Sequence, residues 1–377
     1  MTFREIFRRG DSLLAGSAIL LGILSLVLLG TNANSVNFGF FLRQALFMAI
    51  AILVLVFFAK THYALFRTMS QIFFIGLIVL LVIVLQASMI RGAASWLVFG
   101  GLHLQPGELA KVILVIVLAK IIAESRNGVA DIGVLLKTVF FAGLPIVLVM
   151  LQPDFGTAAL LVFIWLGMIL TAGLKKRQFI VLSIIAVLLG ASGWMFFLKP
   201  YQKERVMVFL QPESDPLGSG YTVMQSVTAF GSGGMWGRGL GYGPQSRLNF
   251  LPENRTDFIF ARIGEELGLV GVMGVLALYA TILWRMLNAA IKTSDPFGRG
   301  LAVGAFTALL SGVMVNASMN LGILPVTGVP LPFISYGGSG LLTMFILVGL
   351  VESVLIHGET WEHNDTNDVV PIQFGTN

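Results

Sequence analysis

A charged segment at residues 245–268 carries the clearest chemical signal in this sequence. Within QSRLNFLPENRTDFIFARIGEELG, Asp257 stands on a loop just before an apolar helix, with Arg255 beside it and Arg247 and Arg262 within reach. A carboxylate can deprotonate a hydroxyl, and guanidinium groups can stabilise a departing pyrophosphate. These residue types suit phosphate-dependent sugar transfer. The alternative interpretation is an isolated surface salt bridge, which contributes little energy.

Two further motifs place ionisable residues where an apolar chain rarely tolerates them. Glu108 and Lys111 in QPGELAK (105–111) open an apolar helix, and their i, i+3 spacing allows them to pair on one face. A first-turn acid and a snorkelling lysine are the structural alternative. Asp154 in LQPDFGTA (151–158) follows a proline, and it either caps the next helix or faces a ligand.

The segment GILPVTGVPLPFISYGGSG (322–340) has three prolines and almost no charge, so it is not a helix. Non-helical backbone at membrane depth is tolerated only where it lines a cavity or is buried in protein. The polar contacts of this segment are expected from Asn316 and Asn320, just before it, and from Ser335 and Tyr336 within it. Both a packed re-entrant loop without chemistry and a wall of a substrate site fit this pattern.

Composition predicts the class of protein that must position these residues. Hydrophobic residues make up 56% of the chain and charged residues 11%, which is too few to cover a soluble surface. The net charge of +5 comes from basic residues near helix ends, so it indicates membrane topology and no nucleic-acid binding. The chain has no cysteine, hence no disulfide framework. Its first apolar segment, preceded by three arginines, fits an uncleaved signal-anchor helix.

Runs of about 18 or more apolar residues, long enough to cross a bilayer, recur along the chain. They predict an all-α polytopic membrane protein with ten transmembrane helices. The expected spans are 12–30, 42–59, 71–90, 107–123, 132–151, 155–173, 178–198, 264–287, 300–322 and 336–357.

Basic residues alternate between the short loops, and this alternation predicts orientation. Both termini are expected in the cytoplasm, and the long loop 199–263 between spans seven and eight on the outer face. Inside that loop, 221–231 predicts a short amphipathic helix, and the glycine tract 231–243 lacks the features of a nucleotide-binding loop. Residues 1–357 form one transmembrane domain, followed by a polar, acidic tail at 358–377 that is expected to be disordered.

Taken together, the motifs resemble the shape, elongation, division and sporulation family, which includes RodA and FtsW. The strings that carry the resemblance are QPGELAK, QPDFGTA, RVMVFLQPESDPLGSGYTVMQS, FGSGGMWGRG, FLPENRTDFIFARIGEELGLVG and LPVTGVPLPFISYGGSG. They cover roughly residues 90–345 in the order that the family has, and QPESDPLGSGY and GPQSRLNFLPE look more like RodA.

The resemblance implies a peptidoglycan glycosyltransferase in the bacterial cytoplasmic membrane that polymerises lipid II. Its donor is a glycan on undecaprenyl pyrophosphate, and its partner is a class B penicillin-binding protein. The family's essential acid corresponds to Asp257, as the base or as a ligand of a divalent cation such as Mg or Mn. No organic cofactor is expected. A lipid II flippase is the alternative. The residues expected to contact substrate are Glu108, Lys111, Asp154, Arg205, Arg247, Arg255, Asn316, Ser335 and Tyr336.

Overall fold

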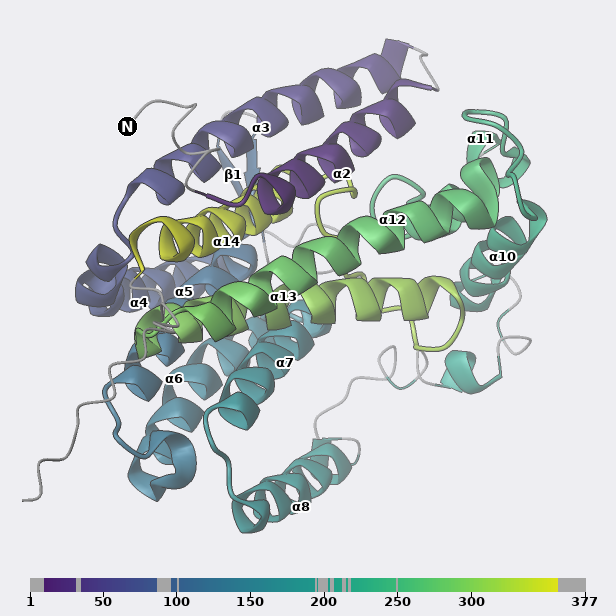
Figure 1. Cartoon of the computed structure of the whole chain (residues 1–377). Coiled ribbons are helices and arrows are strands. Elements are labelled where there is room, and N and C mark those ends of the chain that lie inside the picture. The colour runs from purple at the N-terminus through teal and green to yellow at the C-terminus, as the bar shows by residue number, and fades with distance from the viewer. Residues whose placement is uncertain are drawn as a thin grey trace, which may run out of the picture.

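The computed structural model of the chain describes residues 10–31, 35–86, 96–99, 102–193, 195, 203, 207–211, 215, 218–248 and 250–358. Within these residues almost every element is a helix, and the long helices run side by side in one bundle (Figure 1). The predicted all-helical class is confirmed. One short antiparallel hairpin, β1 (Leu97–Phe99) with β2 (Leu102–Leu104), is an addition that hydropathy did not predict.

Ten of the described helices overlap the predicted spans, with bounds that differ by up to seven residues. They are α2 (Ser12–Gly30), α3 (Ser35–Lys60), α4 (Ala64–Leu85), α5 (Pro106–Ala123), α6 (Ile132–Leu151), α7 (Phe155–Thr171), α8 (Lys176–Ser192), α12 (Ile259–Lys292), α13 (Pro296–Asn320) and α14 (Gly338–His357).

Seven of these helices are long and apolar enough to cross a membrane, as judged over the described residues. The three others are α5, which carries Glu108, Lys111 and Lys120, and α7 and α8, which have 17 residues each. The chain is therefore a polytopic helical membrane protein. The count of ten spans remains a prediction.

Aspartates define where several of these helices begin. Asp11, Asp131, Asp154 and Asp295 are the N-cap residues of α2, α6, α7 and α13, and each side chain accepts a backbone N–H from the first turn. A helix leaves its first N–H groups without internal partners, and a short acidic side chain satisfies them. The boundaries of these helices thus follow from local sequence.

The centre of the bundle is formed by α13, which packs against α5, α7 and α12, while α14 packs mainly against α3. Glycines permit the close contact between α13 and α5. A Cβ atom on Gly304 would lie 2.4 Å from Val115 Cγ1, and one on Gly300 would lie 2.8 Å from Ala119 Cβ. Small residues at helix interfaces are how membrane helices approach each other. By contrast α8 lies at the edge of the bundle (Figure 1).

Short helices are also present: η1 (Gly128–Ala130), α10 (Ser219–Ser232) and α11 (Pro244–Arg247). The predicted amphipathic helix at 221–231 corresponds to α10, which packs on α12. The predicted tail from 358 lies outside the described residues, apart from Gly358 itself. The interior of the bundle is apolar, with side chains such as Leu114, Leu301 and Phe345 fully buried.

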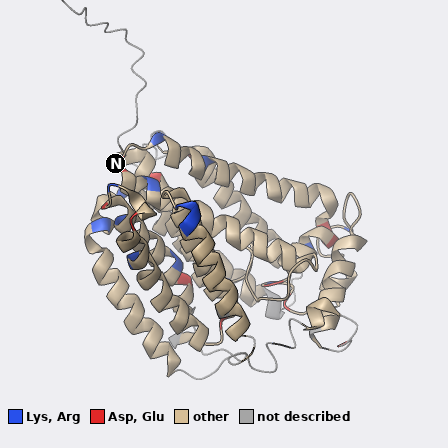
Figure 2. Ribbon diagram, turned by 90° about the horizontal axis from the view of Figure 1, so that it is seen from below, with Lys and Arg blue, Asp and Glu red and all other residues tan. Residues whose placement is uncertain are grey.

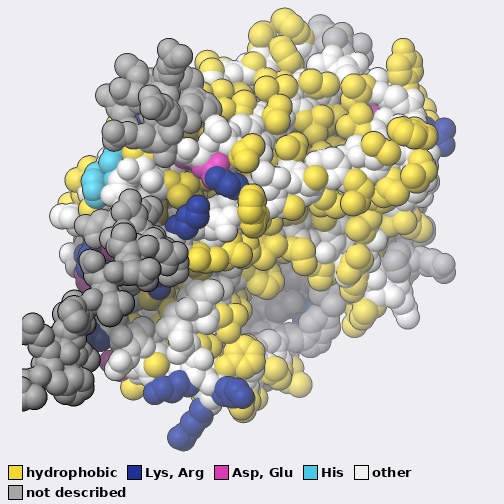
Figure 3. All heavy atoms as spheres, viewed as in Figure 1, with side chains coloured by type: hydrophobic (Ala, Val, Ile, Leu, Met, Phe, Trp, Pro, Cys, Tyr) yellow, Lys and Arg dark blue, Asp and Glu magenta, His cyan; other side chains and the backbone are white. Residues whose placement is uncertain are grey.

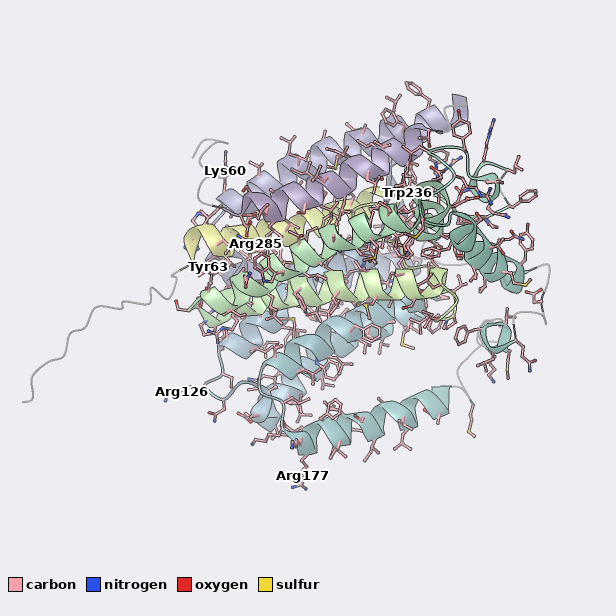
Figure 4. All side chains as sticks on the ribbon, turned by 45° about the vertical axis from the view of Figure 1, so that its right-hand side comes forward. Lys60, Tyr63, Arg126, Arg177, Trp236 and Arg285 are labelled. Carbon is pink, nitrogen blue, oxygen red and sulfur yellow. The ribbon has the colours of Figure 1, made fainter. Side chains whose placement is uncertain are left out.

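Charged residues are sparse along the ribbon (Figure 2). Apolar side chains cover the middle of the face seen in Figure 3. Lys60, Arg126, Arg177 and Arg285 lie towards one end of the bundle, and Trp236 lies near the opposite end (Figure 4). This separation is typical of a membrane protein whose basic loops share one side.

Candidate active site

Asp257 lies in the turn that leads into α12, at the end where α10 and α11 gather. The carbonyl of Glu253 accepts the N–H groups of Thr256 (3.1 Å) and Phe258 (3.2 Å), which folds the chain back on itself before the helix begins. Asp257 is half-buried there, between the exposed Pro252–Glu253 corner and the buried Phe258. The predicted position, on a loop just ahead of an apolar helix, is confirmed.

Three successive carbonyls of this turn bind to α13 and to the loop that follows it, residues 321–337. Tyr336 N donates to Arg255 O (2.8 Å), and Ser335 Oγ donates to Thr256 O (2.6 Å). Asp257 O accepts from the side-chain amides of Asn316 and Asn320, each at 2.9 Å. The backbone of the turn is therefore fixed from 255 to 257, which is how a rigid scaffold holds a reactive side chain.

The loop 321–337 also reaches the carboxylate itself. A Cβ atom on Gly328 would lie 3.7 Å from Asp257 Oδ2, and Gly328 has a positive φ of 73° that a side chain would disfavour. The loop is braced internally, because Ser335 Oγ accepts the N–H of Leu331 at 2.7 Å. The predicted non-helical character of the segment is confirmed, and its residues lie against Asp257.

The predicted pair of Glu108 and Lys111 is present and buried. Lys111 Nζ lies 2.7 Å from Glu108 Oε1, and both side chains are only a few per cent exposed. The second carboxylate oxygen, Glu108 Oε2, is buried without a protein hydrogen-bond partner, and it lies close to Gly340 at the start of α14. A buried acceptor normally has a partner, so this oxygen is available to a ligand or to water.

Asp154 serves as the N-cap of α7 and also joins two elements. Its Oδ1 accepts Thr157 N at 3.0 Å, and its Oδ2 accepts Thr157 Oγ1 (2.9 Å) and Gln105 Nε2 (2.8 Å). Gln105 in turn donates its backbone N–H to Ser339 Oγ (3.2 Å). The starts of α5, α7 and α14 therefore meet at one place, which brings three of the predicted motifs together.

The arginines that were expected to bind pyrophosphate are Arg205, Arg247 and Arg255. The guanidinium of Arg255 lies over the ring of Phe40, 4.9 Å from its centroid, and partial burial lowers the pKa of Arg255. Nearby Arg262 lowers that pKa further, whereas Glu253 acts in the opposite direction. Arg247 is exposed at the end of α11, and Arg205 lies outside the described residues. Only Arg255 is thus shown in the same turn as Asp257.

Arg262, which the sequence placed within reach of Asp257, bonds to partners on α12 and α2. It is buried and pairs with Glu266 at 2.7 Å, and it donates to Leu28 O at 2.6 Å. Its neighbour Glu265 accepts the N–H groups of Gln245 (2.7 Å) and Ser246 (3.1 Å). Glu265 therefore holds α11 against α12.

Sequence reasoning missed a break in α12. Gly268 has a non-helical φ of 67° and ψ of −168°, and the glycine tract fills the gap in the hydrogen-bond ladder. Arg238 N and Gly239 N donate to the carbonyls of residues 265 and 266, while the N–H groups of residues 269 and 270 donate to the carbonyls of residues 234 and 235. A glycine-rich tract followed by a glycine inside the next span was the available signal.

Two other polar groups were missed. Gln44 is buried in α3, where it donates to Ser335 O (3.4 Å) and accepts Gly337 N (3.3 Å). A lone glutamine in an apolar run was its only signal. At the opposite end, Glu352 is buried and accepts Asp11 N at 2.8 Å, and Asp11 also pairs with Arg285. Because this second cluster brings together helices far apart in sequence, hydropathy gave no sign of it.

Within the described residues, no group of three or more His, Cys, Asp or Glu side chains could hold a metal ion. A magnesium ion is often bound by one or two carboxylates together with the phosphates of a substrate. The carboxylate of Asp257 is one such donor.

Comparisons with known proteins agree with these motifs. The family model for FtsW, RodA and SpoVE, described as a cell cycle protein, matches residues 11–360. Peptidoglycan glycosyltransferase MrdB of Escherichia coli K12 is 38% identical over 329 residues, which are 86% of this chain and 88% of that protein. Stage V sporulation protein E of Bacillus subtilis is 37% identical over 330 residues, 84% of this chain and 87% of that protein.

Solved structures show the same fold. One chain, from work on structural coordination of polymerization and crosslinking by a peptidoglycan synthase complex, superposes with a TM-score of 0.80 at 30% identity. The match covers 92% of this chain and 97% of that one. The rod shape determining protein RodA of Thermus thermophilus gives a TM-score of 0.67 at 26% identity and covers 92% and 96% of the two chains.

Proposed function

This chain belongs to the FtsW, RodA and SpoVE family, and we propose that it polymerises lipid II into glycan strands at the outer face of the cytoplasmic membrane. Peptidoglycan glycosyltransferase activity, in the service of elongation, follows from the family and its named members. The observation that carries the finer proposal is Asp257, a half-buried carboxylate whose turn is bound at three successive carbonyls.

In the proposed reaction, the 4-hydroxyl of an incoming lipid II attacks the anomeric carbon of a glycan that is linked to undecaprenyl pyrophosphate. An α-linked donor that yields a β-1,4 bond requires inversion, hence a single displacement without a glycosyl-enzyme intermediate. Asp257 orients the acceptor hydroxyl and takes its proton as the new bond forms. The pyrophosphate leaves with the bonding electron pair as an anion, so no general acid is required.

The departing pyrophosphate needs positive charge around it. Arg255 is the candidate nearest to Asp257 in the chain, and Arg205 and Arg247 remain proposed contacts. A planar guanidinium suits phosphate oxygens, because it offers paired donors in a fixed geometry. A divalent cation, held jointly by Asp257 and the pyrophosphate, would supply further charge stabilisation.

The lipid-linked sugars are proposed to lie along the starts of α5, α7 and α14. The buried Oε2 of Glu108 supports this location, because an acceptor without a protein partner can bind a sugar hydroxyl. Lys111 Nζ pairs with the other carboxylate oxygen, Glu108 Oε1, at 2.7 Å, which holds the side chain in place. Asp154, Asn316, Ser335 and Tyr336 are proposed to border the same substrate, although their described hydrogen bonds serve the protein's own backbone and side chains.

We propose ten spans, with both termini in the cytoplasm and the loop 199–263 outside, in the cytoplasmic membrane of a bacterium. The common location of Lys60, Arg126, Arg177 and Arg285, opposite Trp236, supports this orientation (Figure 4). A class B penicillin-binding protein is the proposed partner. The similarity to a chain of a peptidoglycan synthase complex supports it. The named relatives favour transfer over the alternative of a lipid II flippase.

The function is tested by incubating the purified full chain with labelled lipid II and resolving glycan strands on a gel, with and without a partner transpeptidase. Asp257→Ala should lower polymer formation at least about 100-fold, the usual contribution of a general base. Asp131→Ala is the control, because it removes an exposed cap aspartate from α6. Full activity of Asp257→Ala would contradict the proposed role, and loss of activity with a chelator would support the cation.

A further inference from the structure

The start of α12 differs from the starts of the helices that follow capping aspartates. Its N-cap residue is Phe258, which makes no side-chain cap hydrogen bond. Asp257 stands one residue before that position. If the helix began one residue earlier, Asp257 would occupy the N-cap, as Asp154 does in α7 and Asp295 does in α13. An aspartate in that position uses its carboxylate to satisfy backbone N–H groups.

A side chain from another helix supplies the missing cap. Asn320, the last residue of α13, accepts the N–H of Ala261 on its Oδ1 at 2.9 Å. Its Nδ2 donates to Asp257 O, also at 2.9 Å. In a continuous helix these two backbone groups, four residues apart, would bond to each other. One carboxamide instead bridges them, and the first helical bond of the ladder is displaced to Arg262 N and Phe258 O (3.2 Å).

Asn320 is itself held in place. It is fully buried, and its Nδ2 also donates to Asn316 O at 2.9 Å. Its own carbonyl accepts Ser226 Oγ of α10 at 2.8 Å. An amide that is fixed on several sides acts as a rigid spacer between α13 and the turn before α12.

We propose that Asn320 is a positioning residue for the transfer reaction. By capping Ala261 and binding Asp257 O, it keeps Asp257 outside the N-cap position, where its carboxylate can meet the acceptor hydroxyl. This inference rests on the proposed function of Asp257. It predicts an effect on the chemical step, because a displacement of about 1 Å can lower a rate about 100-fold.

The test uses Asn320→Leu, which keeps the branching at Cγ and removes both hydrogen bonds, while Asn316 still donates to Asp257 O. In the purified full chain with labelled lipid II, kcat should fall about 10- to 100-fold and KM should stay within about two-fold. Gln178→Leu is the matched control. It removes an amide that donates to Val129 O (3.1 Å) and Ala130 O (3.3 Å) in another part of the bundle, and it should keep wild-type kcat.

Hydrogen exchange gives a readout that does not depend on activity. The Ala261 amide should exchange faster in Asn320→Leu than in wild type, and at the wild-type rate in Gln178→Leu. If Asn320→Leu does not fold, Asn320→Ala takes its place in both measurements. A wild-type kcat in the variant, a kcat loss equal to that of the control, or unchanged exchange at Ala261 would overturn the inference. Wild-type protein that makes no glycan would refute the proposed function instead, and exchange would still decide the cap.

Discussion

At the scale of single residues, the most deeply buried charges of the proposed substrate site form an ion pair. Glu108 and Lys111 are an ion pair almost out of contact with solvent, and one oxygen of Glu108 has no protein partner. Taking two charges out of water is costly, and the pair recovers that cost only while both members are present. We therefore expect that substituting one member of the pair lowers the free energy of unfolding far more than substituting both.

Lys111→Met should lower the free energy of unfolding by about 3–5 kcal/mol, because Glu108 is then left buried without a counter-charge. Adding Glu108→Gln should restore most of that loss. Thermal unfolding of the purified protein in detergent measures both. The exposed pair Arg67–Glu124, at 3.9 Å, is the control, and Arg67→Met should cost less than about 1 kcal/mol. Equal costs at the two sites would contradict the buried pair's importance.

At the scale of elements, the break in α12 determines how the glycine tract 231–243 attaches to the bundle. A helix inside a membrane must satisfy every backbone group, and at Gly268 the glycine tract does so from outside the helix. The two backbones are in close contact, since a Cβ atom on Gly268 would lie 2.3 Å from Gly237 N. The break therefore requires glycine in both segments, at residue 268 of α12 and at residue 237 of the tract. Their backbone conformation disfavours a side chain, and the close contact leaves no room for one.

Gly268→Ala should destabilise the protein by about 1–3 kcal/mol or more, because the alanine would carry a strained φ and contact backbone atoms that cannot move aside. Gly274→Ala in the same helix is the matched control. No atom lies within 4 Å of a Cβ there, and alanine favours a helix. Thermal unfolding compares the stabilities of the two variants. A Gly268→Ala variant as stable as wild type would show that the glycine tract can pack on α12 without the break at Gly268.

At the scale of the whole molecule, the two ends of the bundle carry different polar clusters. One end holds Asp257, Glu108 and Asp154 with the loop 321–337, and the other holds Asp11, Arg285 and Glu352. Basic residues gather at the second end (Figure 4). By the positive-inside rule, this distribution supports the proposed orientation, with the end that holds Asp257 outside the cell.

Because the chain has no cysteine, single introduced thiols report this orientation without background. Trp236→Cys should react with a membrane-impermeant maleimide in intact cells, since Trp236 is 80% exposed near the reaction end. Arg126→Cys should react only after the membrane is permeabilised. The opposite pattern would invert the proposed topology and would place Asp257 on the cytoplasmic side.

Much of this architecture was predictable from sequence because its causes are local. Apolar runs gave the helices, and α2 and α6 have the predicted bounds, since hydropathy and capping aspartates act over a few residues. Glu108 and Lys111 were predictable as a pair because their spacing lies within one helix. Asp257 was singled out from its place between a loop and a span, and its catalytic role stays a prediction.

What only the tertiary structure decided are the relations between residues distant in sequence. Arg262 and Asp257 are five residues apart and both charged, yet Arg262 is buried against α2 whereas Asp257 stays in the turn beside Gly328. Asn320 binds a turn 63 residues away. The sequence alone determined which helices form, since those preferences are local. Which polar groups face the site depended on how the helices pack, because burial and hydrogen-bond partners exist only once distant segments meet.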